Sequence, residues 1–407
     1  MKKIIFLSLA CSCIFGSGYK IPEQSGDSVA MSAANIAKSF GADASYYNPA
    51  NMVFLNDARH LGEIGGTLIY LKKAKYVPNK ENGNDQYAKS KDFSIVAPNL
   101  HFVSPEYFPN LRFGLSFAVP AGMTMRWEEE FKSKAFAKEF QLKVFEINPS
   151  VAYRFSDQFS AAFGLRAVYS KGVVKNQFDQ TFNRDITGDS VDFGYNLAFT
   201  YKPTQNLSFA ATYRSNVDLT LKGDADIDLS TDPGYKGYHD KVSVEIPLPA
   251  TLNLATSYTL NKTTFLATYE RIFWSKFKNI DFEYDKEIHP GLKGNFDDPV
   301  IKNWKDTNAY RFAIAHELND EIRLMAGFAY DESVSKDKFV GFELPESKAF
   351  LYSAGINYKF SDNLQTGLSY LYQDRQNRNV KNTHQQTNGK FINGDVQLVN
   401  LNLKFTF

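Results

Sequence analysis

Residue types that commonly carry out catalysis or bind metals are few and scattered in this sequence. No H-E-x-x-H, P-loop or G-x-S-x-G motif is present, and nothing pairs a histidine with a carboxylate and a nucleophile. The acidic runs at 128–130 and 297–298 lack the regular ligand spacing of a calcium loop. The six histidines stand singly, at His60, His101, His239, His289, His316 and His384. We therefore predict a protein that is not an enzyme and that has no metal site and no cofactor.

Both cysteines lie in an N-terminal segment that is typical of a secretory signal. Two lysines follow the first methionine and precede a short apolar stretch. We predict that residues 1–16 form a signal peptide. Removal of this segment would take Cys11 and Cys13 with it, which excludes disulfides and cysteine metal sites in the mature chain. A lipoprotein signal at either cysteine is the alternative.

Composition narrows the class of protein further. The 407 residues include 46 basic and 45 acidic side chains, and the net charge of +1 argues against nucleic acid as a partner. After Phe15, no apolar run reaches the about 18 residues that a membrane-spanning helix needs. The 35 phenylalanines and 23 tyrosines suit the aromatic girdles of a membrane β-barrel.

From about His60 onward, apolar and polar residues alternate with a period of two. This pattern is typical of β-strands that have one apolar and one polar face. The clearest examples are 192–202 and 350–360. These runs reach the about 9–11 residues of a membrane strand, whereas strands of soluble sandwiches more often have about 5–6 residues. Their length favours a membrane barrel.

The number and the connections of these segments favour the same fold. Short polar turns alternate with long polar loops, as periplasmic turns and outer loops do in bacterial barrels. We predict an all-β fold in which residues 58–407 form a transmembrane antiparallel barrel of about 14 strands, an even number as such barrels require. The fourteen segments begin near residues 60, 93, 110, 142, 158, 188, 206, 242, 263, 307, 321, 348, 364 and 394.

The stretch before the barrel has a different composition. Residues 17–57 are rich in Ala, Ser and Gly and contain the turn-forming triplet Asn48-Pro49-Ala50. We predict that this stretch is a plug, or hatch, inside the barrel lumen. Helical spacing of apolar residues also predicts a short amphipathic helix over 126–140, in one of the long outer loops.

The last strand alternates as far as the terminal Phe407. A strand ending in Phe resembles the C-terminal signal of outer-membrane barrels, so we expect the outer-membrane assembly machinery to recognise Phe407. Pairing of this strand with the first strand would leave no open edge. We accordingly expect an integral protein of a Gram-negative outer membrane, in contact with its lipid and lipopolysaccharide.

Several short motifs occur together in one order. They are S-G-Y-K-I-P-E at 17–23, N-P-A at 48–50, P-N-L-H-F-V-S-P at 98–105, Y-R-S at 213–215, W-S-K-F at 274–277, A-Y-R at 309–311 and Y-D-E-S at 330–333. In this order they resemble the FadL-type outer-membrane transporters, a family for long-chain fatty acids and aromatic hydrocarbons. The resemblance implies fourteen strands, an N-terminal hatch and gated diffusion of hydrophobic compounds, most of all long-chain fatty acids.

The resemblance also implies roles for single residues in ligand binding. Tyr19 is expected to reach into an apolar pocket, and Lys171 and Asp331 match the family's basic and acidic positions. Lys302 and Lys305 are rival matches for a second basic position. A ligand carboxylate buried in such a pocket needs a cationic or hydrogen-bonding partner.

A kink in the third strand is the family's route for sideways release into the bilayer. In this chain Pro120, which lacks a ladder donor, and Gly122, which tolerates a bend, stand in that strand. The alternative is that both residues only end the strand at the rim. Asn48 and Pro49 are expected to shape the hatch rather than to contact ligand.

Two other functions stay open. A general porin or a surface adhesin could use the same barrel, although a plug argues against an open porin. A phospholipase-type hydrolase would need a Ser–His pair at one membrane rim, and the sequence offers no candidate for that pair.

Overall fold

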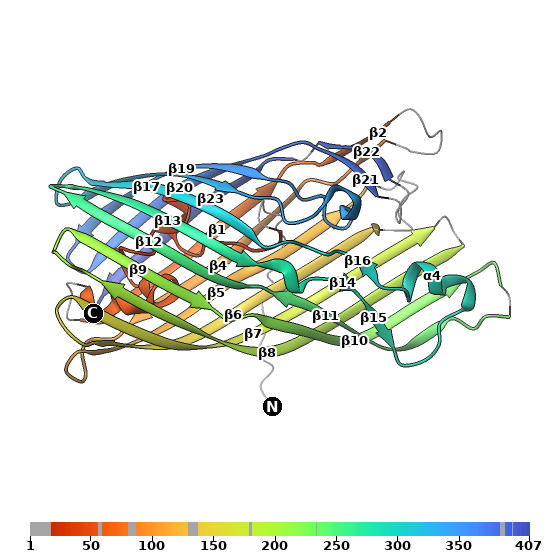
Figure 1. The fold of residues 1–407 in the computed structure, drawn as a ribbon, viewed down its shortest axis with the longest axis horizontal. Coiled ribbons are helices and arrows are strands. Elements are labelled where there is room, and N and C mark those ends of the chain that lie inside the picture. Colours follow the sequence, from red (N-terminus) through yellow and green to blue (C-terminus); the bar gives the residue numbers. More distant parts are fainter. Residues whose placement is uncertain are drawn as a thin grey trace.

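The computed structural model describes residues 18–55, 59–79, 87–128, 137–178, 181–232, 234–382, 387–392 and 394–407. These residues form a closed antiparallel β-barrel of 14 wall strands with the N-terminal segment inside it (Figure 1). The prediction of an all-β barrel with an internal plug is therefore confirmed. The predicted signal peptide lies outside the described residues, as do the residues at 56–58. Within the described residues, no helix has the length and apolar character needed to cross a membrane.

The wall strands are long and mostly continuous. Two of them are interrupted, at Ser215–Asn216 and at Pro249, and carry two labels each. The wall consists of β1 (Leu61–Leu71), β4 (Phe93–Val103), β5 (Leu111–Arg126), β6 (Glu139–Arg154), β7 (Phe159–Phe178), β8 (Phe182–Tyr201), β9 (Leu207–Arg214) with β10 (Val217–Leu229), β11 (Tyr238–Leu248) with β12 (Ala250–Leu260), β13 (Thr263–Phe273), β17 (Thr307–Glu317), β18 (Ile322–Asp331), β19 (Ala349–Ser361), β20 (Leu364–Arg375) and β23 (Val396–Thr406).

The predicted strand starts agree with these bounds to within a few residues, and the count of fourteen is confirmed. The largest difference is at residue 188, because β8 already begins at Phe182. The barrel closes where β1 pairs with β23, from Leu61 opposite Thr406 to Leu71 opposite Val396. Closure satisfies the backbone groups of both terminal strands, which lipid could not do.

The two faces of the wall strands differ as predicted. On β8, the side chains of Phe193, Tyr195 and Phe199 are exposed on the outer face, while Asn196 and Ala198 between them are buried. Apolar residues outside and polar or small residues inside are the arrangement of a membrane barrel.

The outer loops carry secondary structure of their own. The predicted helix over 126–140 is wrong at both ends, where Arg126 belongs to β5 and Glu139 begins β6, and residues 129–136 lie outside the described part. Four short strands form a separate sheet in the loops, namely β2 (Lys75–Pro78), β3 (Ala88–Lys89), β21 (Arg378–Asn382) and β22 (Thr387–Ile392). The other loop elements are η3 (Trp274–Lys276), β14 (Asn279–Ile280), β15 (Phe282–Tyr284), η4 (Pro290–Leu292), α4 (Lys293–Phe296), β16 (Val300–Ile301) and η5 (Asp337–Phe339).

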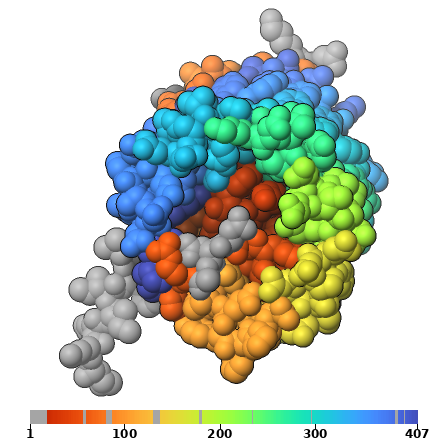
Figure 2. All heavy atoms as spheres, turned by 90° about the vertical axis from the view of Figure 1, so that its left-hand side faces the viewer, coloured from red at the N-terminus to blue at the C-terminus, as the bar shows by residue number. Residues whose placement is uncertain are grey.

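The hatch, residues 18–55, lies within the ring of wall strands. Figure 2 shows its red and orange atoms inside the barrel, seen from the end that carries the short turns. Its helical elements are α1 (Gly26–Ala30), α2 (Ala44–Tyr47) and η1 (Pro49–Phe54). Asp27 in α1 accepts hydrogen bonds from Lys404 of β23 (2.6 Å) and Asn357 of β19 (2.8 Å). Such buried ionic contacts join the hatch to the wall.

The N-P-A triplet lies inside the hatch. The side chain of Asn48 accepts a hydrogen bond from the backbone N–H of Ala50 (3.1 Å) and so caps η1, where Pro49 takes the first position. The Asn48 amide also donates to the carbonyl oxygen of Ile36 and to Thr200 Oγ1 of β8, each at 2.9 Å. The triplet therefore orders the hatch and connects it to the wall.

Glu23 is a hatch residue with a buried carboxyl group that has no hydrogen-bond partner. Burial raises the pKa of Glu23 to about 7; Arg311 and Lys20 oppose the shift and Asp331 adds to it. A carboxyl whose pKa is higher in the docked hatch than in an undocked one favours docking only while it is protonated.

We therefore expect the contribution of Glu23 to hatch docking to be largest below about pH 4.5 and to be lost as the pH rises through about 7. Replacement Glu23→Gln should remove this part of the pH dependence, on the order of 3 kcal/mol. Hydrogen exchange of hatch amides across that pH range, corrected for intrinsic exchange, measures it. Glu321→Gln, in an exposed turn, is the matched control. Equal slopes for wild type and Glu23→Gln would contradict the assignment.

Candidate functional site

The barrel wall has a gap between β4 and β5. In the part of the chain that the structure describes, the ladder between them covers only Leu100–Val103 opposite Gly114–Phe117. On the other side of β5, the register with β6 shifts between Ala118 and Ala121. From Ala118 to Met125 every residue of β5 is buried, so this part of the strand turns toward the lumen. The strand does not end at the rim, because β5 continues to Arg126.

Proline chemistry explains where the gap begins. Pro120 has no N–H to donate to a neighbouring strand, and it stands at the register shift. Gly122 follows within the same buried stretch. The structure thus places both residues at a break in the wall; their role in ligand release stays a prediction.

The hatch occupies the place that β4 leaves free. Lys20 faces Ala121 across an isolated antiparallel bridge. The N–H of Ile21 donates to the carbonyl oxygen of Pro120, and the N–H of Gly122 donates to that of Tyr19, each at 2.9 Å. The first residues of the hatch therefore act as a short strand against the inner side of β5.

Gln24 extends this pairing with its side chain. Its amide nitrogen donates to the carbonyl oxygen of Val119 and its amide oxygen accepts from the N–H of Val119, each at 2.8 Å. A side chain here imitates the two hydrogen bonds of a neighbouring strand. Without it, both buried backbone groups of Val119 would lose their partner, at a cost of about 1–3 kcal/mol for each group.

The other end of this hatch segment fills an aromatic chamber. The ring centroid of Tyr19 lies 4.8 Å from that of Trp274, 6.1 Å from Phe277 and 5.7 Å from Trp304. Its hydroxyl donates a hydrogen bond to the carbonyl oxygen of Pro247 on β11. The cavity left beside these rings is about 20 Å³, roughly the space of one water molecule. Its other apolar lining residues are Met123, Phe140, Ile246, Ile280, Phe339 and Leu344.

One buried ion pair lies in this chamber. The ammonium group of Lys302 contacts the carboxylate of Glu343, and the two side chains are 5 % and 7 % exposed. Both line the same cavity as Tyr19. Of the two rival lysines, Lys302 is thus in the chamber, whereas Lys305 is exposed and does not line it.

Two of the predicted ligand-binding residues lie elsewhere. Lys171 is exposed on β7, on the same outward face as Tyr169, so we do not expect it to contact a ligand in the chamber. Asp331 is buried in an ion network that includes Arg311 (3.2 Å), which also contacts Glu270 at 3.0 Å. Lys20 of the hatch pairs with the same Glu270. Asp331 therefore helps to bind the hatch to the wall and does not line the chamber.

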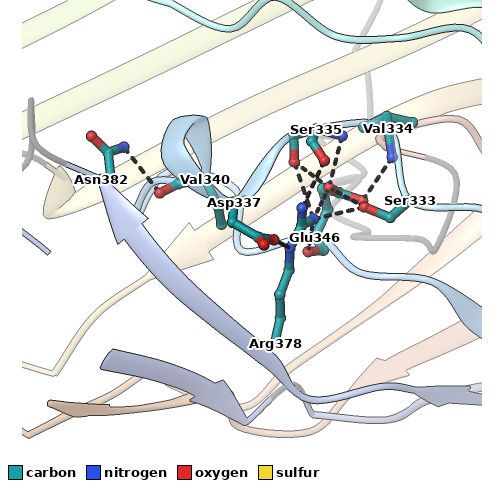
Figure 3. A network of polar contacts seen from close by, with 8 residues as sticks. All are labelled: Ser333, Val334, Ser335, Asp337, Val340, Glu346, Arg378 and Asn382. Carbon is teal, nitrogen blue, oxygen red and sulfur yellow. Dashed lines mark hydrogen bonds and ion pairs between the residues drawn. The ribbon is translucent and has the colours of Figure 1, made fainter. Parts of the chain in front are cut away.

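A fixed outer loop covers the chamber. Glu346, fully buried, accepts hydrogen bonds from Arg378 of β21 (2.5 Å) and from the N–H of Ser335 (3.0 Å), as Figure 3 shows. The amide of Asn382 donates to the carbonyl oxygen of Val340 (3.0 Å). The loop 332–348 is thereby tied to the hairpin of β21 and β22 on both sides of Glu343.

Sequence reasoning missed two residues of the candidate site, Gln24 and Glu343. Both are polar residues in segments that resemble ordinary hatch or loop sequence, and neither belongs to a motif. A weak signal exists for Gln24, because it follows the P-E pair of the mature start directly. Nothing local marks Glu343, since its partner Lys302 comes from a different loop.

Replacement Gln24→Leu should loosen the hatch segment from β5 while the barrel stays folded. We expect the amides of Ile21 and Gly122 to exchange about tenfold faster or more, because Val119 is left with unpaired buried groups. Hydrogen exchange read by mass spectrometry measures this. Gln158→Leu, in an exposed turn, is the control. Unchanged protection in Gln24→Leu would show that the side chain does not hold the segment.

Comparison with known proteins relates this chain to outer-membrane transport proteins. The family model described as "Outer membrane protein transport protein (OMPP1/FadL/TodX)" matches residues 7–407. The "Long-chain fatty acid transport protein" of Escherichia coli O6:H1 is 24 % identical over 345 residues, covering 75 % of this chain and 76 % of that protein.

Two solved structures share the fold. A Pseudomonas aeruginosa FadL homologue superposes with a TM-score of 0.83 at 16 % identity, covering 96 % of this chain and all of the other. The Ralstonia pickettii toluene transporter TbuX gives a TM-score of 0.70 at 16 % identity, with 94 % and 98 % covered. The chain belongs to the FadL/TodX family of outer-membrane proteins, which transport hydrophobic compounds and are not enzymes.

Proposed function

We propose that this protein takes up elongated hydrophobic molecules, foremost long-chain fatty acids, through the aromatic chamber and releases them sideways through the gap between β4 and β5. The observation that carries this proposal is that one short segment, Tyr19–Ile21, fills both places. Tyr19 occupies the chamber, and the backbone on either side of Lys20 pairs with β5 in the gap.

The chamber and the gap are thereby coupled. The cavity of about 20 Å³ is far smaller than the roughly 300 Å³ or more of a ligand site. A ligand must therefore displace Tyr19 from its aromatic neighbours. Because Tyr19 and Gly122 share a backbone hydrogen bond, displacement of the ring strains the pairing that closes the gap.

Fatty acids are the first candidate because relatives named for their transport match this chain at 22–24 % identity. The relation to the toluene transporter concerns the fold alone and makes aromatic hydrocarbons the second candidate. A porin or an adhesin has no need of an aromatic chamber filled by its own hatch. Contact with lipopolysaccharide, and recognition of Phe407 by the assembly machinery, stay predictions.

A cross-link tests the coupling directly. Lys20 and Ala121 form a non-hydrogen-bonded antiparallel pair. The Cα atoms of such pairs typically lie about 4.5 Å apart, which suits a disulfide. The double variant Lys20→Cys/Ala121→Cys, expressed in cells that lack their own transporter, should lose uptake of labelled hexadecanoic acid. Reduction of the disulfide should restore uptake.

The two single-cysteine variants are the matched controls, because neither can form the disulfide and Lys20→Cys by itself removes the contact of Lys20 with Glu270. Mass spectrometry of lipid extracted from the purified wild type identifies what it carries. Full uptake by the oxidised double variant would contradict release through this gap. Absence of any bound or transported hydrophobic compound would contradict the function itself.

A further inference from the structure

The aromatic chamber contains two side chains of opposite charge that form an ion pair with each other. Among the described residues that line the cavity, Lys302 and Glu343 are the two charged ones. The two hydroxyl groups of the lining have partners already. The hydroxyl of Tyr19 donates to Pro247, and that of Ser335 donates to Glu346. A ligand head group that enters this space therefore meets an ammonium group whose charge is neutralised by Glu343.

Resting on the proposed function, we propose that Glu343 determines head-group specificity: it holds the place on Lys302 that a ligand carboxylate would take. The chamber then selects uncharged hydrophobic molecules, and it binds a fatty acid in the protonated, neutral form. Both uncharged alcohols and protonated acids can donate a hydrogen bond to the Glu343 carboxylate and accept one from Lys302.

The electrostatics of a buried site support this selection. An anionic ligand would place two carboxylates beside one ammonium group in a region that excludes water. Like charges at this distance disfavour the ionised form of one of them, and an uncompensated buried charge is strongly unfavourable. A neutral head group leaves the existing pair intact and avoids that cost.

The loop that carries Glu343 is held on both sides of this residue. The neighbouring carbonyl oxygen of Phe342 accepts a hydrogen bond from the indole N–H of Trp127 (2.9 Å), and that of Pro345 accepts one from Arg375 (2.8 Å). On the other side of the pair, the N–H of Lys302 donates to the carbonyl oxygen of Lys278 (2.8 Å). Hydrogen bonds therefore hold the backbone on both sides of the pair, and this keeps the two side chains close to each other at the chamber.

Binding of a fatty acid at this site is expected to be coupled to the uptake of a proton. A fatty acid that arrives as an anion takes up one proton from water, and this proton ends on the ligand carboxyl or on Glu343. The titratable groups that line the site are Glu343, Lys302 and Tyr19. An uncharged alcohol of the same chain length takes up no proton.

Replacement Glu343→Gln tests this assignment. At about pH 8, where a free carboxylic acid is ionised, wild-type protein should bind hexadecan-1-ol about tenfold or more tighter than hexadecanoic acid. The variant should bind the acid about tenfold tighter than wild type does, because Lys302 is then free to pair with it. Affinity for the alcohol should stay within about twofold. Isothermal titration in buffers of different ionisation enthalpy should show proton uptake when wild type binds the acid and none when Glu343→Gln binds it.

The double variant Lys302→Gln/Glu343→Gln keeps the test valid if a lone buried lysine prevents folding. It has no charge in the chamber, so preference for the alcohol and proton uptake by the acid should both resemble wild type. Glu287→Gln, at a loop residue whose side chain is 88 % exposed, is the control and should change nothing.

The outcomes separate the two proposals. An unchanged ratio of acid to alcohol affinity in Glu343→Gln would overturn the role of Glu343 while transport stands. Tighter binding of the anion than of the alcohol by wild type would overturn it as well. Failure of wild type to bind either compound would overturn the proposed function instead.

Discussion

The structure depends on how β5 satisfies its backbone where it separates from β4. A strand inside a membrane cannot leave N–H and C=O groups unpaired, because lipid offers no hydrogen bonds. Here the missing partner is supplied from the lumen, by the backbone of Tyr19–Ile21 and by the side chain of Gln24. A gate in a barrel wall requires a strand whose partner can leave, and a partner that belongs to the hatch and not to the wall meets this requirement if the hatch moves.

The hatch can supply backbone partners to β5 only if it is held in one position, and ionic contacts with the wall provide that position. Lys20 pairs with Glu270 of β13, and Asp27 pairs with Lys404 of β23. Two points near the start of the hatch are thus bound to different strands of the wall. Buried pairs of this kind add little net stability, yet they specify position strongly, since breaking one leaves a charge without a partner. They place Tyr19 in the chamber and Ile21 against β5 at the same time.

The fold was predictable from sequence because membrane barrels obey simple local rules. Alternation, strand length and the order of short and long connections marked all fourteen strands. The early start of β8 at Phe182 was missed because its polar outer end no longer faces lipid, so the alternation there weakens. The small sheet of β2, β3, β21 and β22 was missed because it joins loops that are far apart in sequence.

The site was less predictable, for a physical reason. Tyr19 and Lys302 could be found by resemblance, whereas Lys171 lies on the outer face, since one residue of shift along a strand reverses the side that it faces. The pair of Lys302 and Glu343, and the contact of Gln24 with Val119, join segments distant in sequence. Only the closed barrel brings such residues together.

The central claim is that ligand in the chamber releases the hatch from β5. Its most direct test is hydrogen exchange of the purified wild-type protein with and without saturating hexadecan-1-ol. The account predicts that ligand abolishes protection of the Ile21 and Gly122 amides and leaves the β12–β13 ladder unchanged. Equal protection of those two amides in the free and ligand-bound protein would contradict it.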